Sequence, residues 1–131
     1  MKPKLKVLVV DDDIDFSESL RDLLELQGYD ATAIYSGYKA LEKLKKEKFD
    51  IVLMDIKMPG MNGVEAFREI KKINARLVVI LMTAFSFEDL TEDAFKEGAF
   101  AVLYKPLDIP KLLQHLDCAK SEVKSYTEDK P

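Results

Sequence analysis

The sequence predicts an α/β protein built on a doubly wound parallel sheet of five strands. Five short apolar segments alternate with five segments in which apolar residues recur at helical spacing. Most of the apolar segments lack an alternation of apolar and polar residues, which is typical of parallel strands covered on both faces. No linker, repeat or low-complexity segment divides the 131 residues. The pattern therefore indicates one domain with helices on both sides of the sheet.

The first predicted strand and helix lie between residues 5 and 28. Segment Leu5–Val10 is largely apolar and rich in valine, which favours a buried strand. Asp13 belongs to a residue type that caps helices, and Gly28 is a typical residue at a helix end. The helix between them is expected to bury one face, which consists of Phe16, Leu20, Leu23 and Leu24.

The second and third strands differ in apolar character. Segment Ala31–Tyr35 predicts a strand at an edge of the sheet, and Ser36 is expected to cap the helix that follows. Segment Ile51–Met54 consists of four apolar residues and predicts a buried strand. A proline and two glycines then bend the chain before a helix expected from about Val64 to Ile73.

The last two strands follow the same pattern. Segment Leu77–Met82 is the most apolar run of the chain and predicts a central strand. A helix is expected to begin at Ser86, and Ala99–Tyr104 predicts the fifth strand. Asp108 is expected to cap the last helix. Beyond Cys118 the apolar spacing lapses, which predicts a domain over residues 1–118 and a polar, frayed tail over residues 119–131.

Composition excludes several classes of protein. The net charge of -4 gives no general attraction to nucleic acid or to anionic membranes. No apolar run approaches the roughly 20 residues that span a bilayer, and no apolar stretch of signal-peptide length follows the basic start. The single cysteine, Cys118, cannot form an internal disulfide and fits a reducing compartment. We therefore expect a cytoplasmic protein without direct nucleic-acid or membrane partners.

Polar residues follow four of the predicted strands at the point where each strand ends. Because parallel strands end on the same side of a sheet, these residues are expected at one rim; they are Asp11, Asp12, Asp55, Thr83 and Lys105. Each alone has a structural explanation, as a capping residue, a turn hydroxyl or a solvated lysine. Their convergence instead predicts a functional site.

The predicted rim has the chemistry of a phosphoryl acceptor. Its clustered carboxylates repel one another and need a cation. Oxygen ligands at a partly open site suit Mg²⁺, whereas zinc would need cysteine or histidine ligands that this rim lacks. A carboxylate beside Mg²⁺, a lysine and a hydroxyl can accept a phosphoryl group, because the two cationic groups neutralise the transferring oxygens.

With these motifs in order, the sequence resembles the receiver domains of two-component response regulators. The resemblance covers roughly Lys4 to Cys118 and implies a flavodoxin-like sheet with strand order 2-1-3-4-5. The motifs that carry it are Val9–Asp13, Met54–Gly63, Met82–Ala84 and Tyr104–Pro106.

The resemblance implies a role for each residue at the rim. Asp55 would be the phosphoacceptor and would take the group from a phosphohistidine of a sensor histidine kinase or phosphotransfer protein. Asp12 would bind Mg²⁺ directly together with Asp55 and the backbone carbonyl of Lys57, and Asp11 would act through water. Thr83 would bond one phosphoryl oxygen.

Further implications concern the lysine and the output surface. Lys105 would pair with a phosphoryl oxygen, and a cis peptide bond is expected between Lys105 and Pro106. The protein would catalyse only its own phosphorylation and dephosphorylation, would act on an output domain or target through the face of residues 86–116, and could form a homodimer when phosphorylated. Val102 stands where the family usually has an aromatic switch residue, and Tyr104 on the same strand face is a candidate substitute.

Three other functions fit the sequence less well than that of a receiver domain. An aspartate-nucleophile phosphatase would need a second acid two residues after Asp55, where this chain has Lys57. A flavin or nucleotide binder would need a glycine-rich loop after the first strand, where three aspartates stand instead. A pseudo-receiver that serves only as a binding surface would not need all of the chemical groups at the rim.

Overall fold

The structure is a computed structural model that describes residues 4–84 and 98–128, with side chains described as far as Val123. Five parallel strands form one sheet in the order β2-β1-β3-β4-β5. The predicted fold class and the strand order implied by the family resemblance are therefore confirmed. The strands are β1 (Lys6–Val10), β2 (Asp30–Ile34), β3 (Ile51–Asp55), β4 (Val78–Thr83) and β5 (Ala101–Tyr104).

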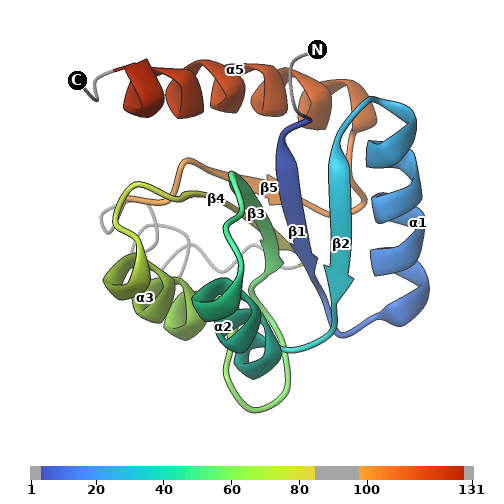
Figure 1. The fold of residues 1–131 in the computed structure, drawn as a ribbon. Coiled ribbons are helices and arrows are strands. Elements are labelled where there is room, and N and C mark those ends of the chain that lie inside the picture. The colour runs from blue at the N-terminus through green and yellow to red at the C-terminus, as the bar shows by residue number, and fades with distance from the viewer. Residues whose placement is uncertain (1–3, 85–97, 129–131) are drawn as a thin grey trace.

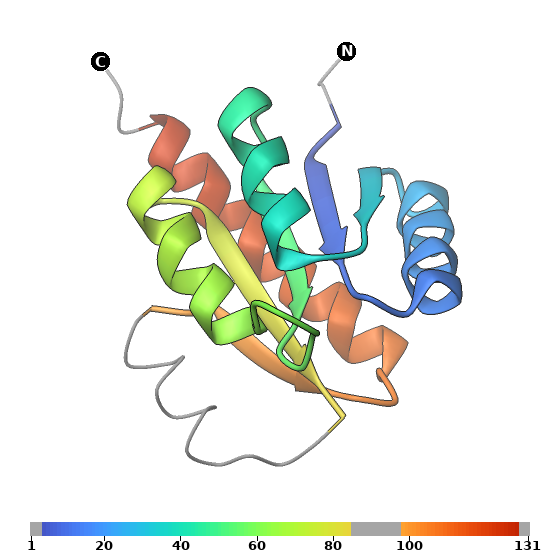
Figure 2. The same ribbon diagram turned by 90° about the horizontal axis from the view of Figure 1, so that it is seen from below.

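Helices cover both faces of this sheet (Figures 1 and 2). Helices α2 and α3 pack on one face and α1 and α5 on the other, as the two clusters of buried side chains show. None of the helices in the described ranges is long and apolar enough to span a membrane. The helix expected from Ser86 lies outside the described residues. The described helices are α1 (Ile14–Leu26), α2 (Gly37–Lys46), α3 (Gly63–Ile73) and α5 (Ile109–Glu128).

Successive residues of the central strands serve opposite layers of the core. In β1, Leu8 packs with α2 and α3, whereas Val7 and Val9 pack with α1 and α5. All residues of β3 and β4 are buried, which is the physical reason for their uninterrupted apolar sequences. The two apolar layers hold the strand ends in register, so the loops after the strands start from fixed positions.

The predicted helix caps are present, and the structure adds one that the sequence analysis missed. The side chains of Asp13 and Ser36 accept hydrogen bonds from backbone N–H groups in the first turns of α1 and α2. At the start of α3, Asn62 and Glu65 form a reciprocal capping box. The capping box fixes where α3 begins and therefore the length of the loop after β3.

The expectation of a frayed chain beyond Cys118 is wrong for residues 119–128. Helix α5 continues to Glu128, and Ala119 is fully buried. Val123 packs against the core, and the ammonium of Lys120 lies 5.0 Å from the centre of the Tyr29 ring. These residues extend the apolar stripe of α5 at helical spacing, but alanine and valine are small, so the stripe is inconspicuous in the sequence.

Candidate functional site

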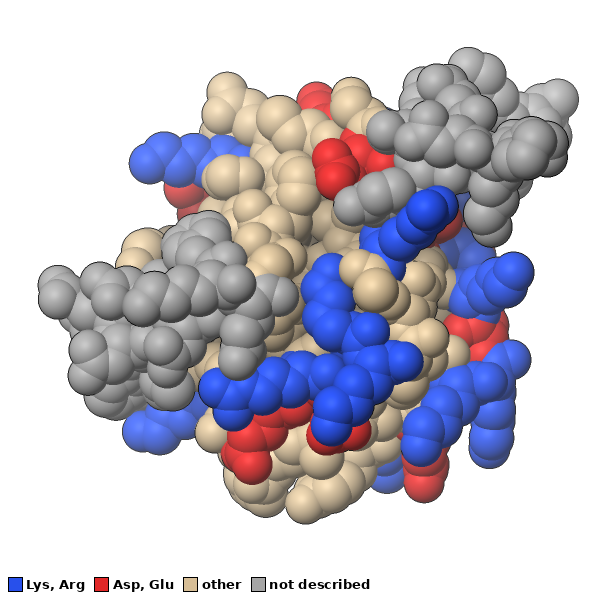
Figure 3. Space-filling model, turned by 90° about the vertical axis from the view of Figure 1, so that its left-hand side faces the viewer, with Lys and Arg blue, Asp and Glu red and all other residues tan. Residues whose placement is uncertain are grey.

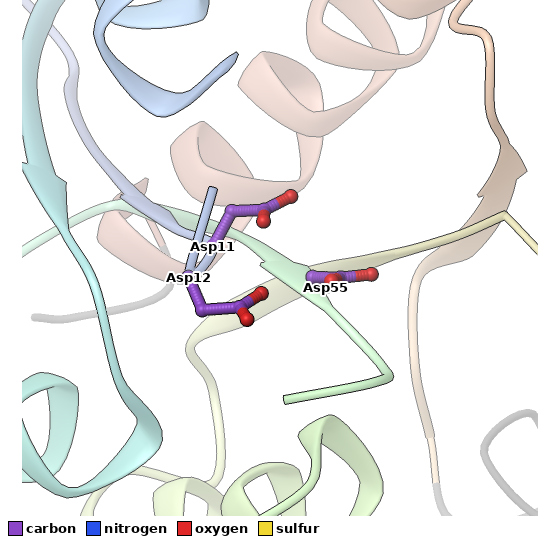
Figure 4. Close-up of side chains that lie close together, drawn as sticks. All are labelled: Asp11, Asp12 and Asp55. Carbon is purple, nitrogen blue, oxygen red and sulfur yellow. The ribbon is translucent and has the colours of Figure 1, made fainter. Parts of the chain in front are cut away.

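Three carboxylates meet at the end of the sheet to which the strand arrows point in Figure 1. Asp11 and Asp12 follow β1, and Asp55 is the last residue of β3 (Figure 4). One carboxylate oxygen from each lies within 4.8 Å of the others. Asp11 and Asp55 are buried, whereas Asp12 is exposed. The cluster is therefore open to solvent on the side of Asp12.

Backbone hydrogen bonds between neighbouring strands continue into the loops that carry the site. The N–H of Asp11 donates to the carbonyl of Ile34 (3.1 Å), and the N–H of Ile56 donates to that of Met82 (2.8 Å). The N–H of Lys105 donates to the carbonyl of Thr83 (2.7 Å). The rim is thus tied to the sheet at several strand ends, which restricts where its side chains can lie.

Lys105, which follows the edge strand β5, completes the cluster. Its ammonium nitrogen lies 2.5 Å from Oδ2 of Asp11 and 3.7 Å from Oδ1 of Asp55. The same nitrogen lies 4.3 Å from the centre of the Phe16 ring, a favourable cation–π geometry. The bond between Lys105 and Pro106 is cis, as the family resemblance implies.

Burial and neighbouring charges make Asp55 an unusually basic carboxylate. Its pKa is raised to about 6, first because burial disfavours the ionised form and then because Asp11 is negatively charged. Asp12 adds to this effect, while Lys105 and a backbone hydrogen bond from Lys57 oppose it. Two like charges held this close create a strong demand for a cation at the site.

Two residues of α1, Ser17 and Phe16, support the site but were not identified as site residues from the sequence. The hydroxyl of buried Ser17 donates to the carbonyl of Asp11 (2.8 Å), and Oδ1 of Asp11 accepts from the N–H of Asp13 (3.0 Å). Phe16 lies beneath the ammonium of Lys105. Both supports lie on α1 one turn from the aspartates, so the helical period was the available signal.

The loop after β3 folds back tightly over the strand end. The N–H of Gly63 donates to the carbonyl of Ile56 (2.6 Å). A Cβ atom at Gly63 would collide with the carbonyl oxygen of Asp55 and with the Cα atom of Ile56. Only glycine allows this approach. Gly60 in the same loop has a positive φ of 78°, which also favours glycine.

The structure brings four of the predicted site residues into direct proximity and places the other two beside them. Thr83 is buried at the end of β4, opposite Tyr104 of β5. Lys57 lies in the loop after β3 with an exposed side chain, and its backbone bonds the carboxylate of Asp55. The four residues in contact or near contact are Asp11, Asp12, Asp55 and Lys105.

The donor set fits a hard divalent cation. All three side chains offer carboxylate oxygen, and no histidine or cysteine belongs to the described cluster. The exposed position of Asp12 leaves room for the water ligands that Mg²⁺ retains. Fold and site together define an α/β protein with a buried carboxylate, a candidate Mg²⁺ site and a lysine at the carboxyl ends of a parallel sheet.

Comparison with known proteins identifies the family of this chain. The family described as "Response regulator receiver domain" matches residues 7–117. The chain therefore belongs to the response regulator receiver family and is a receiver domain of two-component signal transduction. Receiver domains of this kind work with sensor kinases and output domains.

Several relatives and solved structures agree with this assignment. The chain is 36% identical over 131 residues to the transcriptional regulatory protein ZraR of Salmonella typhimurium. This match covers 100% of this chain and 30% of ZraR. It is 35% identical over 107 residues to the sporulation initiation phosphotransferase F of Bacillus subtilis, and this match covers 82% of this chain and 86% of that protein. A receiver domain protein from Clostridium thermocellum superposes with a TM-score of 0.89 at 32% identity and covers 93% of this chain and 98% of its own.

Proposed function

We propose that Asp55 accepts a phosphoryl group from a partner's phosphohistidine and that the phosphorylated site changes the outer surface of the domain. The observation that carries this proposal is the approach of three carboxylates to within 4.8 Å beside an ammonium that lies 3.7 Å from Oδ1 of Asp55. A purely structural cluster gains nothing from such repulsion. Phosphoryl transfer needs both a carboxylate nucleophile and cationic groups beside it, which this arrangement provides.

Each residue has a separate part in the reaction. A carboxylate oxygen of Asp55 attacks phosphorus while the phosphorus–nitrogen bond of the donor breaks and its electron pair stays with the imidazole. Lys105 leaves Asp11 to pair with a phosphoryl oxygen, and Thr83 donates its hydroxyl proton to another. Asp11, Asp12, Asp55 and the carbonyl of Lys57 would hold Mg²⁺, which when bound neutralises charge on the transferring oxygens.

The raised pKa of Asp55 suits the nucleophile. A more basic carboxylate is a better nucleophile, provided that it is ionised at the working pH. With a pKa of about 6, most of the group is ionised at neutral pH. A bound cation would keep the Asp55 carboxylate ionised at still lower pH, because the cation cancels the repulsion from Asp11.

The test is phosphorylation by a small acyl phosphate in the presence of Mg²⁺. Intact-mass spectra should show one added phosphoryl group, which is lost in alkali. Asp55→Asn should not gain it, because an amide is a poor nucleophile. Asp13→Asn is the matched control, since asparagine caps a helix as well as aspartate does; it should be phosphorylated normally. Full phosphorylation of Asp55→Asn would refute the assignment.

Membership of the receiver family indicates the classes of partner that this domain binds. We propose a sensor histidine kinase or phosphotransfer protein as donor, and an output domain or target protein that binds the face of residues 86–116. Phosphorylation-dependent homodimers, catalysis limited to the domain's own phosphorylation and dephosphorylation, and the cytoplasmic location stay predictions. The chain spans 25–30% of the ZraR proteins that it matches, so the activity of a longer protein is also a proposal.

A further inference from the structure

A hollow lies at the end of the sheet opposite to the phosphoacceptor site. Its volume is about 570 Å³, and it lies where α2 and α3 end and where β3 and β4 begin. Its floor is apolar and includes Phe49, Ile70, Leu77 and Val123. Val123 belongs to the part of α5 beyond Cys118, so the helical extension of α5 contributes to this floor.

Basic side chains surround this apolar floor. The hollow is lined by four cations, Lys45, Lys46, Lys48 and Arg76, and by two carboxylates. Figure 3 shows Lys and Arg side chains gathered on this side of the molecule, the left-hand side in Figure 1. The chain as a whole has a net charge of -4. The fold therefore separates charge, with acids at the rim and bases around the hollow.

Among the residues that the structure describes, neither carboxylate of the hollow forms an ion pair with Lys45, Lys46 or Lys48. Glu47 is paired with Lys43 (2.8 Å) and Lys6 (2.5 Å), which lower its pKa to about 2. Asp50 accepts a hydrogen bond from the backbone N–H of Lys6 (2.8 Å). Within the described ranges, Lys45, Lys46 and Lys48 form no ion pair. These three ammonium groups are available to an outside partner.

We propose that the basic hollow binds a segment of a partner protein in which a large apolar side chain is flanked by aspartate or glutamate. The apolar side chain would fill the hollow, whose volume lies in the range of ligand sites. The flanking carboxylates would pair with the lysines at the edge. A nucleic acid would use the charge, but its phosphate backbone has no apolar group for the floor, so a protein segment is the better match.

This proposal is independent of the phosphoryl chemistry, because the hollow shares no residue with the rim. The probe is a fluorescein-labelled peptide of sequence Glu-Asp-Leu-Phe-Asp-Glu, followed by fluorescence anisotropy with the full chain. Binding should saturate and should weaken as NaCl is raised. Amide chemical shifts should change around residues 44–50 and not at Asp55.

Matched variants and peptides separate the hollow from general charge attraction. Lys48→Glu and Lys45→Glu should each weaken binding by about threefold to tenfold. Lys39→Glu, at the other end of α2, makes the same change in net charge and should weaken binding by less than about twofold. A peptide with Ser-Ser in place of Leu-Phe should bind about tenfold more weakly or worse.

Several results would overturn the proposal. Absence of saturable binding to the native chain is one, and equal weakening by Lys39→Glu and Lys48→Glu is another. Equal affinity for the Ser-Ser peptide would mean that the floor contributes nothing. Tighter binding of a short DNA duplex or of phosphatidylserine vesicles, with the same sensitivity to Lys48→Glu, would assign the hollow to a different class of partner.

Discussion

Lys105 pairs with Asp11 in this structure and lies farther from Asp55: its ammonium nitrogen is 2.5 Å from the carboxylate of Asp11 and 3.7 Å from that of Asp55. The Asp11 side chain is 1% exposed and that of Lys105 is 18% exposed, so the pair is largely shielded from water. Lys105 thus holds two neighbouring carboxylates together in the unphosphorylated protein. In the proposed reaction, it must exchange Asp11 for a phosphoryl oxygen.

Lys105→Met should destabilise the metal-free protein by about 1–3 kcal/mol at neutral pH, because it leaves Asp11 and Asp55 facing each other without a cation. Mg²⁺ should restore part of this loss, since it supplies the missing positive charge. Urea unfolding with EDTA and with Mg²⁺ measures both effects. Lys111→Met, an exposed position at the start of α5, is the control and should change stability little. Equal stabilities of Lys105→Met and the native protein in EDTA would show that the pair contributes nothing.

The second prediction concerns pH and Asp55. Because its pKa is raised from 3.8 to about 6, the ionised carboxylate costs folding free energy. The cost is absent below about pH 4, grows between the two values and is complete above about pH 6. Asp55→Asn should therefore stabilise the metal-free protein by about 1–2 kcal/mol at neutral pH but not at about pH 4. This stabilisation is smaller than the full pKa difference would give, because contact with water screens part of the charge. Urea unfolding across this range measures the difference, and a constant difference at all pH values would contradict the prediction.

The third prediction separates two adjacent aspartates. Asp12→Ala should weaken Mg²⁺ binding by at least about tenfold, because it removes a proposed direct ligand. Asp13→Ala should leave Mg²⁺ affinity nearly unchanged but lower stability by about 0.5–2 kcal/mol, since Asp13 caps α1. Calorimetric titration and urea unfolding of both variants test this crossed pattern. Unchanged Mg²⁺ affinity in Asp12→Ala would remove Asp12 from the metal site.

The fourth prediction concerns the end of α5. A chain that stops after Cys118 should lose about 1–3 kcal/mol of stability, because Ala119 and Val123 no longer cover the core. A chain that stops after Glu128 should keep full stability, and chemical denaturation compares the two. Identical unfolding curves would mean that the additional turns of α5 pack without a net gain.

The fifth prediction concerns the position of the usual aromatic switch. Val102 is partly buried against the core, and Tyr104 is 52% exposed. Valine has less apolar area to bury than a tyrosine ring, so we expect a modest population shift on activation. Beryllofluoride, a phosphate mimic, should change amide shifts in the native protein less than in Val102→Tyr. Equally large changes in both would show that the missing aromatic is unimportant here.

The sequence predicted the sheet and the rim because both depend on residue type at strand ends. Uninterrupted apolar runs identified β3 and β4, and polar residues after them identified Asp55 and Thr83. Contacts that depend on three-dimensional packing were missed. The ring of Phe16 under Lys105 and the closure of the loop by Gly63 are two examples. The continuation of α5 was missed because Ala119 gives little apolar signal.

The pairing of Lys105 with Asp11 joins residues that are 94 positions apart in the chain. During synthesis, β1 leaves the ribosome early, whereas the lysine arrives only after the other four strands have been made. A nascent chain can therefore expose its three aspartates but cannot complete the rim. The proposed phosphoryl transfer needs Lys105, so it can begin only after the last edge strand has joined the sheet.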